Sequence, residues 1–156
     1  MNCKEREIRD DAEIESLIRE AKVCRLGMTG EQGYPYVVPL CFGYQNKTLY
    51  FHCAEKGLKT ALLRKNPKVC FEMDICKDVK YLSRICDWGM FYKSIIGFGD
   101  VEFLESGEEK KEALDILVRH YGAELMDDEL NYPAAMLKNT LLFKVNIRSM
   151  TGKKSG

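Results

Sequence analysis

The residues best suited to bind a phosphate are two lysines and a glycine at the expected start of a helix. Lys56, Gly57 and Lys59 follow a strand-like stretch at residues 49–53 and open a short helix, whose apolar side is expected to be Leu58, Ala61 and Leu62. The first turn of a helix carries unpaired backbone N–H groups and a partial positive charge, which favour a bound phosphate. Gly57 would let the backbone approach such a ligand closely. The alternative is a solvated, lysine-rich helix start without a ligand.

One of the two histidines lies where it could reach a ligand. His52 is near the end of the expected strand 48–53 and, by alternation, shares a face with Tyr50, opposite the aliphatic face. An imidazole in this position could stack on a ligand, bond to it, or exchange a proton near neutral pH. It could also simply bond a nearby backbone carbonyl. The other histidine, His120, ends an amphipathic helix and is expected to be a cation at its C-terminus.

Motifs for other kinds of chemistry are missing from the sequence. It contains no G-x-S-x-G elbow, no H-E-x-x-H pair and no P-loop. Cys76, Cys86 and a histidine could in principle hold zinc, but their spacing matches no known ligand pattern, so we expect no metal site. With no nucleophile, acid–base pair or metal cage, a bound organic cofactor is the natural carrier of any chemistry.

The charge balance argues against two classes of partner. The chain has 24 Lys and Arg against 24 Asp and Glu, which gives a formal net charge of zero. Proteins that bind nucleic acid by neutralising phosphates usually carry a basic excess or stripe. The same balance weakens the case for an anionic membrane surface. We therefore expect neither a nucleic-acid nor a membrane partner.

Length and the N-terminal residues set the expected organisation. A chain of 156 residues predicts one domain, 1–156. No stretch approaches the roughly 20 apolar residues of a transmembrane helix. The first six residues lead into charge, unlike the apolar core of a secretory signal. These features predict a cytoplasmic protein.

The cysteines favour a reducing environment. Their number is odd and none forms a C-x-x-C pair, so we expect reduced thiols, several of them acting as small core hydrophobes, and no disulfide framework. They are Cys3, Cys24, Cys41, Cys53, Cys70, Cys76 and Cys86.

Hydrophobic periodicity predicts about six strands and three helices. One helix follows a cap at Asp10 or Asp11, one follows Gly57, and one follows the capping-box pattern at Ser106–Glu109. A further short helix is expected around Pro133, while residues 76–88 read as irregular and the tail 150–154 as polar. The expected strands are Val23–Met28, Tyr34–Tyr44, Thr48–Cys53, Lys68–Asp74, Met90–Leu104 and Thr140–Arg148.

Proline and glycine single out two of these strands. Pro35 and Pro39 cannot donate to a sheet ladder, so strand 34–44 must be an edge or bulged, with backbone groups that could meet a ligand. Gly97 and Gly99 inside strand 90–104 indicate a bulge or a close backbone approach. Strands that dominate the middle of the chain and are joined by short turns predict an α+β fold, mainly β, with an antiparallel sheet that forms a barrel.

Several segments, in order along nearly the whole chain, resemble one family. The most distinctive run is Pro35–Leu40 followed by Phe42-Gly43-Tyr44, and further segments are 21–27, 49–59, 66–72, 92–99 and 151–153. Together they resemble the nitroimidazole-resistance (Nim) type of the pyridoxamine 5'-phosphate oxidase-like flavoproteins. Cys53 departs from the serine that relatives often carry, and no proline precedes Cys86-Asp87-Trp88. Nothing resembles the pyridoxamine-phosphate pocket of the oxidase itself.

This resemblance implies an FMN-binding split β-barrel with flanking helices that forms a homodimer with FMN at the interface. Residues Val38–Leu40 would lie along the flavin ring, and Lys59 would hold its phosphate. Tyr92 and Ser94 would approach the flavin, from the same subunit or from its partner. The residues implied to contact the cofactor are Val38, Pro39, Leu40, His52, Cys53, Ala54, Gly57, Leu58, Lys59, Tyr92, Ser94 and Lys153.

The resemblance also implies an activity. A reductase would pass electrons from NAD(P)H through FMN to a small acceptor such as a nitroaromatic (nitroimidazole) compound. His52 would be the catalytic residue, near the ring and able to donate a proton. Two alternatives stay open: a flavin-binding or stress-response protein without turnover, and a related split barrel that holds haem.

Overall fold

The fold is built on one antiparallel sheet, seen in a computed structural model that describes residues 4–122 and 130–155; Cys3 lies outside the described residues. The strands follow the order β3-β2-β6-β7-β8-β5-β4, and β1 pairs with the far end of β8. Their bounds are β1 (Glu7–Ile8), β2 (Cys24–Thr29), β3 (Pro35–Leu40), β4 (Gly43–Gln45), β5 (Thr48–Cys53), β6 (Lys68–Lys80), β7 (Gly89–Leu104) and β8 (Leu141–Ser155).

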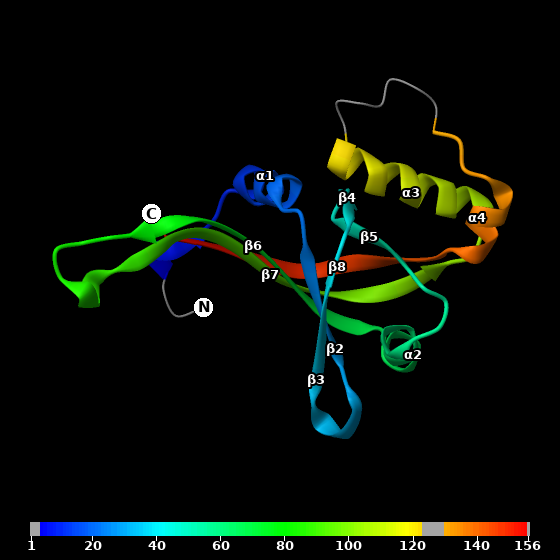
Figure 1. The fold of residues 1–156 in the computed structure, drawn as a ribbon, viewed down its shortest axis with the longest axis horizontal. Helices are drawn as coiled ribbons and strands as arrows, with labels where there is room; N and C mark the ends of the chain where they lie inside the picture. Colours follow the sequence, from blue (N-terminus) through cyan, green and yellow to red (C-terminus); the bar gives the residue numbers. More distant parts are fainter. Residues whose placement is uncertain (1–3, 123–129, 156) are drawn as a thin grey trace.

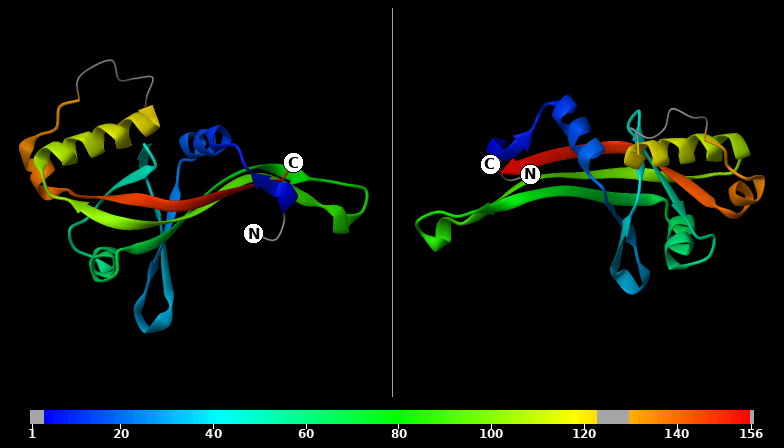
Figure 2. Two further views of the ribbon diagram at one scale, coloured as in Figure 1. Left: turned by 180° about the vertical axis from the view of Figure 1, so that it is seen from behind. Right: turned by 45° about the horizontal axis from the view of Figure 1, so that its top comes forward.

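Helices lie on two sides of the three long strands. Strands β6, β7 and β8 run the length of the molecule (Figure 1), with α1 and α3 on one side and α2 on the other in both further views (Figure 2). The described α-helices are α1 (Asp11–Glu20), α2 (Leu58–Lys65), α3 (Gly107–Gly122) and α4 (Ala134–Asn139), and short 3₁₀ turns are η1 (Lys4–Arg6), η2 (Glu31–Gly33) and η3 (Ile85–Asp87).

The two edges of the sheet are held together by the chain itself. Leu40 ends β3 and Gly43 begins β4, although these strands are opposite edges. In a flat sheet the edges would lie about 29 Å apart at about 4.8 Å per strand spacing. The short connection spans at most about 11 Å. The sheet therefore curls into a barrel that stays open between β3 and β4, which confirms the expected split barrel.

The core requires glycine at the position of β7 that pairs with Phe71 of β6. Phe71 is fully buried, and a Cβ on Gly97 would lie 2.2 Å from the ring atom Cζ of this phenylalanine. The pairing of β7 with β8 also shifts register between Phe98 and Gly99. The expected close approach and the expected bulge are therefore both present.

The helix ends follow the predicted local chemistry. Asp10 caps α1 by accepting from the Ala12 N–H at 3.0 Å. At the start of α3, the Glu109 N–H donates to the Ser106 hydroxyl at 3.1 Å, and the Glu109 carboxylate accepts from the Ser106 N–H. This is the predicted capping box. Helix α4 begins after Pro133, as expected.

Strand 34–44 is wrong as a single strand, because it breaks at Cys41–Phe42. The ring of Phe42 is fully buried, and its N–H donates to the Tyr121 hydroxyl of α3 at 3.0 Å. Gly43 packs against the backbone of Ile116, where a Cβ would lie 2.8 Å from the carbonyl carbon. This anchorage to α3 turns the chain from one sheet edge to the other. The prolines in β3 do mark an edge strand, as predicted.

Two strands continue beyond their predicted ends. β6 extends through the expected irregular stretch to Lys80, which pairs with Gly89, and β8 extends through the expected polar tail to Ser155. The side chains at the far end of β6 are largely exposed, so the sequence there lacks the alternation that reveals a half-buried strand. The short strand β1 was also missed, because two residues carry no period, whereas most of β4 lies within the predicted strand 34–44.

Candidate cofactor site

The start of α2 has the features of an anion-binding helix terminus. Its N-cap residue Gly57 has a φ of 148°, which glycine adopts without strain. In the described structure no side chain caps this helix and no acidic residue lies in its first turn, so the first N–H groups have no side-chain acceptor. Lys59 is half-buried there, and Lys56 and Leu58 are exposed. These features suit a phosphate group.

Thr60 fixes the loop that leads into α2, a role that the sequence reasoning missed. It is 4% exposed, and its hydroxyl donates to the Ala54 carbonyl at 3.1 Å and lies 3.9 Å from the Cys53 sulfur. The prediction that Leu58 and Ala61 supply the apolar side of this helix is wrong: both are exposed. The buried face consists of Thr60, Leu62 and Leu63. The only sign of this role in the sequence was a threonine between the apolar residues of the helix.

His52 opens onto a cavity of about 570 Å³ between β5, α3 and α4. Within the described chain no hydrogen bond joins its ring to another residue. Small-molecule sites commonly have this size, with mostly apolar walls and a few polar groups. The lining residues are Cys41, His52, Leu114, Leu117, Val118, Tyr121, Gly122, Met136 and Thr140.

Tyr121 holds one wall of this cavity in place. Its hydroxyl accepts from the Phe42 N–H at 3.0 Å and donates to the Lys22 carbonyl at 2.8 Å. Burial raises the pKa of Tyr121 to about 12, so the phenol keeps its proton at neutral pH. The tyrosine therefore ties α3 to the connection between β3 and β4. The amphipathic pattern of this helix predicts a buried Tyr121, which is wrong because Tyr121 is 41% exposed, and it gave no sign of this role.

Strand β3 offers its backbone, and not its aliphatic side chains, to a ligand. It pairs only with β2, so its other edge is free within the described sheet. Val38 and Leu40 turn inward and pack against the core, whereas Pro39 between them is exposed. If Val38–Leu40 contact a cofactor as predicted, they would do so through the free backbone edge of β3 and the exposed side chain of Pro39.

The remaining predicted cofactor contacts lie at the other end of the sheet. Ser94 pairs with Lys153 across β7 and β8, and Tyr92 is two residues further along. His52, by contrast, pairs with Leu142 near the beginning of β8. At about 3.4 Å per residue, Leu142 and Lys153 are on the order of 35 Å apart along the strand. One copy of the chain therefore keeps Tyr92, Ser94 and Lys153 apart from His52.

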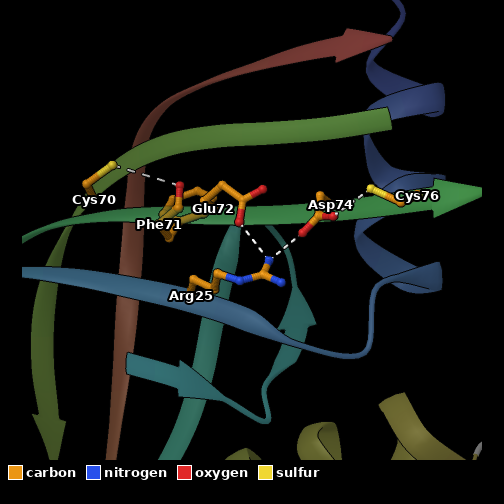
Figure 3. A network of polar contacts seen from close by, with 6 residues as sticks. All are labelled: Arg25, Cys70, Phe71, Glu72, Asp74 and Cys76. Atoms are coloured by element: carbon orange, nitrogen blue, oxygen red, sulfur yellow. Dashed lines mark hydrogen bonds and ion pairs between the residues drawn. The ribbon is translucent and has the colours of Figure 1, made fainter. Parts of the chain in front are cut away.

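The outer face of the sheet combines a salt-bridge network with exposed apolar side chains. Figure 3 shows Arg25 of β2 between two carboxylates of β6, with Nη1 at 2.9 Å from Glu72 and also bonded to Asp74, which accepts from the Cys76 thiol at 3.2 Å. Arg25 pairs with Pro39, and Asp74 with Ser94. The exposed apolar residues on this face are Val37, Ile96 and Phe98. This set, with Pro39 and Ser94, is here named the outer face.

His120 is not the cation that the sequence predicted. It is half-buried under Phe42, with ring centroids 4.3 Å apart, and its Nε2 donates to the Ala21 carbonyl at 2.9 Å. Burial lowers the pKa of His120 below its ordinary value of 6.5, so the ring is neutral at pH 7. Its closeness to α1 overrides the charge that a helix C-terminus would favour.

The cysteines are free thiols wherever the chain is described. Cys24 is buried as a core residue, and burial raises the pKa of its thiol. Cys41 lies in an apolar run, which predicts a buried side chain, but it is exposed at the cavity. Residues 4–122 and 130–155 contain no group of three or more His, Cys, Asp or Glu side chains that could hold a metal. In the same ranges, no helix is both long and apolar enough to cross a membrane.

Comparison with solved structures finds the same architecture. A candidate 5-nitroimidazole antibiotic resistance protein from Bacteroides thetaiotaomicron is 39% identical over 94% of this chain and 85% of its own, with a TM-score of 0.81. Two more distant structures share the fold. They are the FAD and haem binding protein from Mycobacterium smegmatis (16% identity, 96% and 73% coverage, TM-score 0.86) and the flavocytochrome Anf3 from Azotobacter vinelandii (15%, 96% and 69%, 0.83).

Comparison at the level of families gives a match over most of the chain. Among curated proteins no sequence matches. The family model described as pyridoxamine 5'-phosphate oxidase, however, covers residues 10–154. This confirms the resemblance found along segments 21–27 to 151–153. The chain therefore belongs to the pyridoxamine 5'-phosphate oxidase family.

Proposed function

We propose that this protein binds FMN and uses it to pass electrons from NAD(P)H to a small acceptor such as a nitroaromatic compound. The observation that carries the proposal is the continuity of one unit. β5 ends at His52 and Cys53, the loop held by Thr60 follows, and α2 begins directly with Gly57 and Lys59. Groups suited to a phosphate and the imidazole that opens onto the cavity thus belong to one continuous strand–loop–helix segment.

The residues present fit a flavin mononucleotide in two respects. The start of α2 offers backbone N–H groups, the half-buried Lys59 and no acidic side chain in its first turn, which suits a phosphate dianion. The cavity of about 570 Å³ beside His52, on the α3 side of the strands, is mainly apolar with a few polar groups, which suits a small organic acceptor. The free edge of β3 adds backbone donors and acceptors beside Pro39.

The chain's own groups have separable roles in this proposal. Bound flavin would supply the two-electron chemistry, which no side chain of the protein provides. Lys59 and the first N–H groups of α2 hold the phosphate. Tyr121 keeps the wall of the cavity fixed, and α3 and α4 form walls of the cavity that would receive the acceptor. A ring nitrogen of His52 donates a proton to the acceptor as it gains electrons.

The proposal includes a homodimer, because one copy keeps three of the twelve predicted contacts far from His52. Tyr92, Ser94 and Lys153 lie on the order of 35 Å from the level of His52 along β8. Ser94 shares the outer face with Val37, Ile96 and Phe98, which are 57%, 49% and 56% exposed. An exposed apolar patch of this kind is typical of an interface. A second copy covering it would bring Ser94 of one subunit toward the β3 edge of the other.

Haem is a second candidate, favoured by one observation. The cavity presents the imidazole of His52, without a protein partner in the described chain, among apolar walls that include Met136. Such a pocket could accept a haem with His52 as the axial ligand. Two of the distant structures are of proteins whose names include haem or a cytochrome.

The absorbance spectrum of purified protein, followed by turnover, tests these proposals. We expect a yellow protein that releases FMN on denaturation, identified by mass and thereby distinguished from FAD. NADH or NADPH should bleach the flavin, and a nitroaromatic compound or quinone should restore its colour. Flavin that is bleached but inert toward such acceptors would indicate a flavin-binding protein without turnover. A Soret band would support haem, and a protein that stays colourless with both FMN and haem would refute both.

A further inference from the structure

A second cavity lies on the other side of α3, where this helix meets α1 and β4. Its volume is about 390 Å³, and none of its lining residues belongs to the proposed cofactor site. Figure 1 shows the three elements together on one side of the long strands. The lining residues are Arg19, Tyr44, Gln45, Ile116, Arg119 and His120.

A buried hydroxyl without a partner lies in this cavity. Tyr44 is 8% exposed, and its Oη forms no hydrogen bond with any described residue. Such orphan groups are rare in proteins and call for an explanation. The Glu15 carboxylate and the Lys47 N–H lie near the hydroxyl, but neither forms a hydrogen bond with it. Burial raises the pKa of Tyr44. The phenol therefore keeps its proton and can donate it to a ligand.

Two arginines from different helices border the same cavity. Arg19 of α1 is 66% exposed and shares its guanidinium with Glu15 at 3.2 Å. Arg119 of α3 forms no ion pair with residues that the structure describes. With His120 neutral, the balance of Arg19, Arg119 and Glu15 is one net positive charge. A single negative charge would neutralise it.

We propose that this cavity binds a small organic anion, with its carboxylate or phosphate head between Arg19 and Arg119 and bonded to the Tyr44 hydroxyl. The planar arginine fork matches both kinds of oxyanion. Ile116 and the aromatic rings of Tyr44 and His120 supply apolar surface for the body of the ligand. The site is separate from the proposed flavin site and does not depend on it.

The two histidines make the test direct, because each cavity contains one of them. The probes are benzoate, phenyl phosphate and inorganic phosphate, added to the protein as purified with any cofactor in place. We expect at least one of the organic probes to shift the NMR signals of the His120 ring and to leave those of His52 unchanged. Benzoate alone would indicate a carboxylate site, phenyl phosphate alone a phosphate site, and both a general oxyanion site.

Variants assign the binding to the cavity. Tyr44→Phe removes only the orphan hydroxyl, so the fold should be retained, and Arg119→Gln removes one guanidinium. Each should raise the dissociation constant of the bound probe by about tenfold or more, the loss of affinity expected for one charge-assisted hydrogen bond. Arg9→Gln, at an exposed arginine paired with Glu7, is the control and should change nothing. If Arg119→Gln does not fold, Tyr44→Phe decides the question alone.

Four results would overturn the proposal. In the first, the probes shift the NMR signals of His52 and not those of His120. In the second, they bind equally to wild type, Tyr44→Phe and Arg119→Gln. In the third, they fail to bind at about 10 mM, a concentration that would fill even a site of millimolar affinity. Loss of phosphate binding in Lys59→Ala only would place the ion at α2 and would also count against it.

Discussion

Ser94 and Lys153 face each other across β7 and β8, at the end of the sheet remote from His52. Their pairing makes the predicted cofactor contacts fall into two groups that a single copy keeps apart. The first group is fixed by β5 and the start of α2, and the second by the long arm of β7 and β8, while Pro39 of β3 shares the outer face with Ser94. If both groups contact one flavin, the binding site belongs to two subunits, and cofactor retention must depend on association.

The outer face provides a test of that dependence. Ile96→Asp places a charge at an exposed position of this face, so the fold should tolerate it while association weakens by at least about tenfold. Flavin should be lost in parallel. Analytical ultracentrifugation and flavin absorbance measure the two effects on the same samples.

The matched control is Ile85→Asp, at a 79% exposed isoleucine in the turn between β6 and β7. It should remain associated and yellow. A monomeric Ile96→Asp variant that retains its flavin would contradict the two-subunit site. An associated variant that has lost its flavin would contradict the role of the outer face in dimerisation.

Lys59→Ala tests the phosphate end of the site. We expect FMN binding to weaken by about 1.5–3 kcal/mol, the usual contribution of a charge-assisted hydrogen bond. Lys65→Ala, at the opposite end of the same helix, should leave affinity unchanged. Fluorescence titration of FMN measures both. Equal affinities for wild type and Lys59→Ala would show that the phosphate lies elsewhere.

The parts of this fold that the sequence predicted are those with a local cause. Asp10, Ser106 and Glu109 form their caps within a few residues, and Pro35 and Pro39 mark an edge because proline lacks the donor. Alternation in Thr48–Cys53 placed His52 on the face away from the core, where the structure has it. Gly57 and Lys59 lie at the helix start that their order along the chain indicated.

The parts that were missed depend on contacts between distant segments. The break at Cys41–Phe42 follows from the Tyr121 hydroxyl, 79 positions away, which no local pattern reveals. His120 loses its expected charge because α1 covers it. The buried hydroxyl of Tyr44 and the cavity around it also arise only when α1, β4 and α3 meet.

His52→Gln separates chemistry from cofactor binding. The substitution preserves hydrogen-bonding capacity but removes the imidazole, which is the proposed proton donor. Turnover with a nitroaromatic acceptor should fall by about 100-fold or more, within the range of general acid catalysis, while FMN affinity changes by less than about threefold. Steady-state kinetics and fluorescence titration provide the two readouts. Unchanged turnover would remove His52 from the mechanism, and loss of folding would assign it a structural role.

His120 should make stability fall in mild acid. Its pKa is lowered in the folded state by burial, with Arg19 and Lys22 adding repulsion, whereas in the unfolded chain it is near 6.5. The unfolded state therefore binds the extra proton more readily, and folding is favoured fully only above about pH 6.5. As the pH falls from 7.5 toward the folded pKa, this contribution is lost.

His120→Gln isolates that contribution, because it removes the titrating ring at a half-buried position. The difference in free energy of unfolding between wild type and variant should shrink steadily as the pH is lowered from 7.5 to 5, since only wild type must protonate this site on unfolding. Urea denaturation followed by tryptophan fluorescence at several pH values measures it. A difference independent of pH would show that His120 titrates alike in both states. A difference that grows in acid would mean that the folded protein stabilises the charged ring.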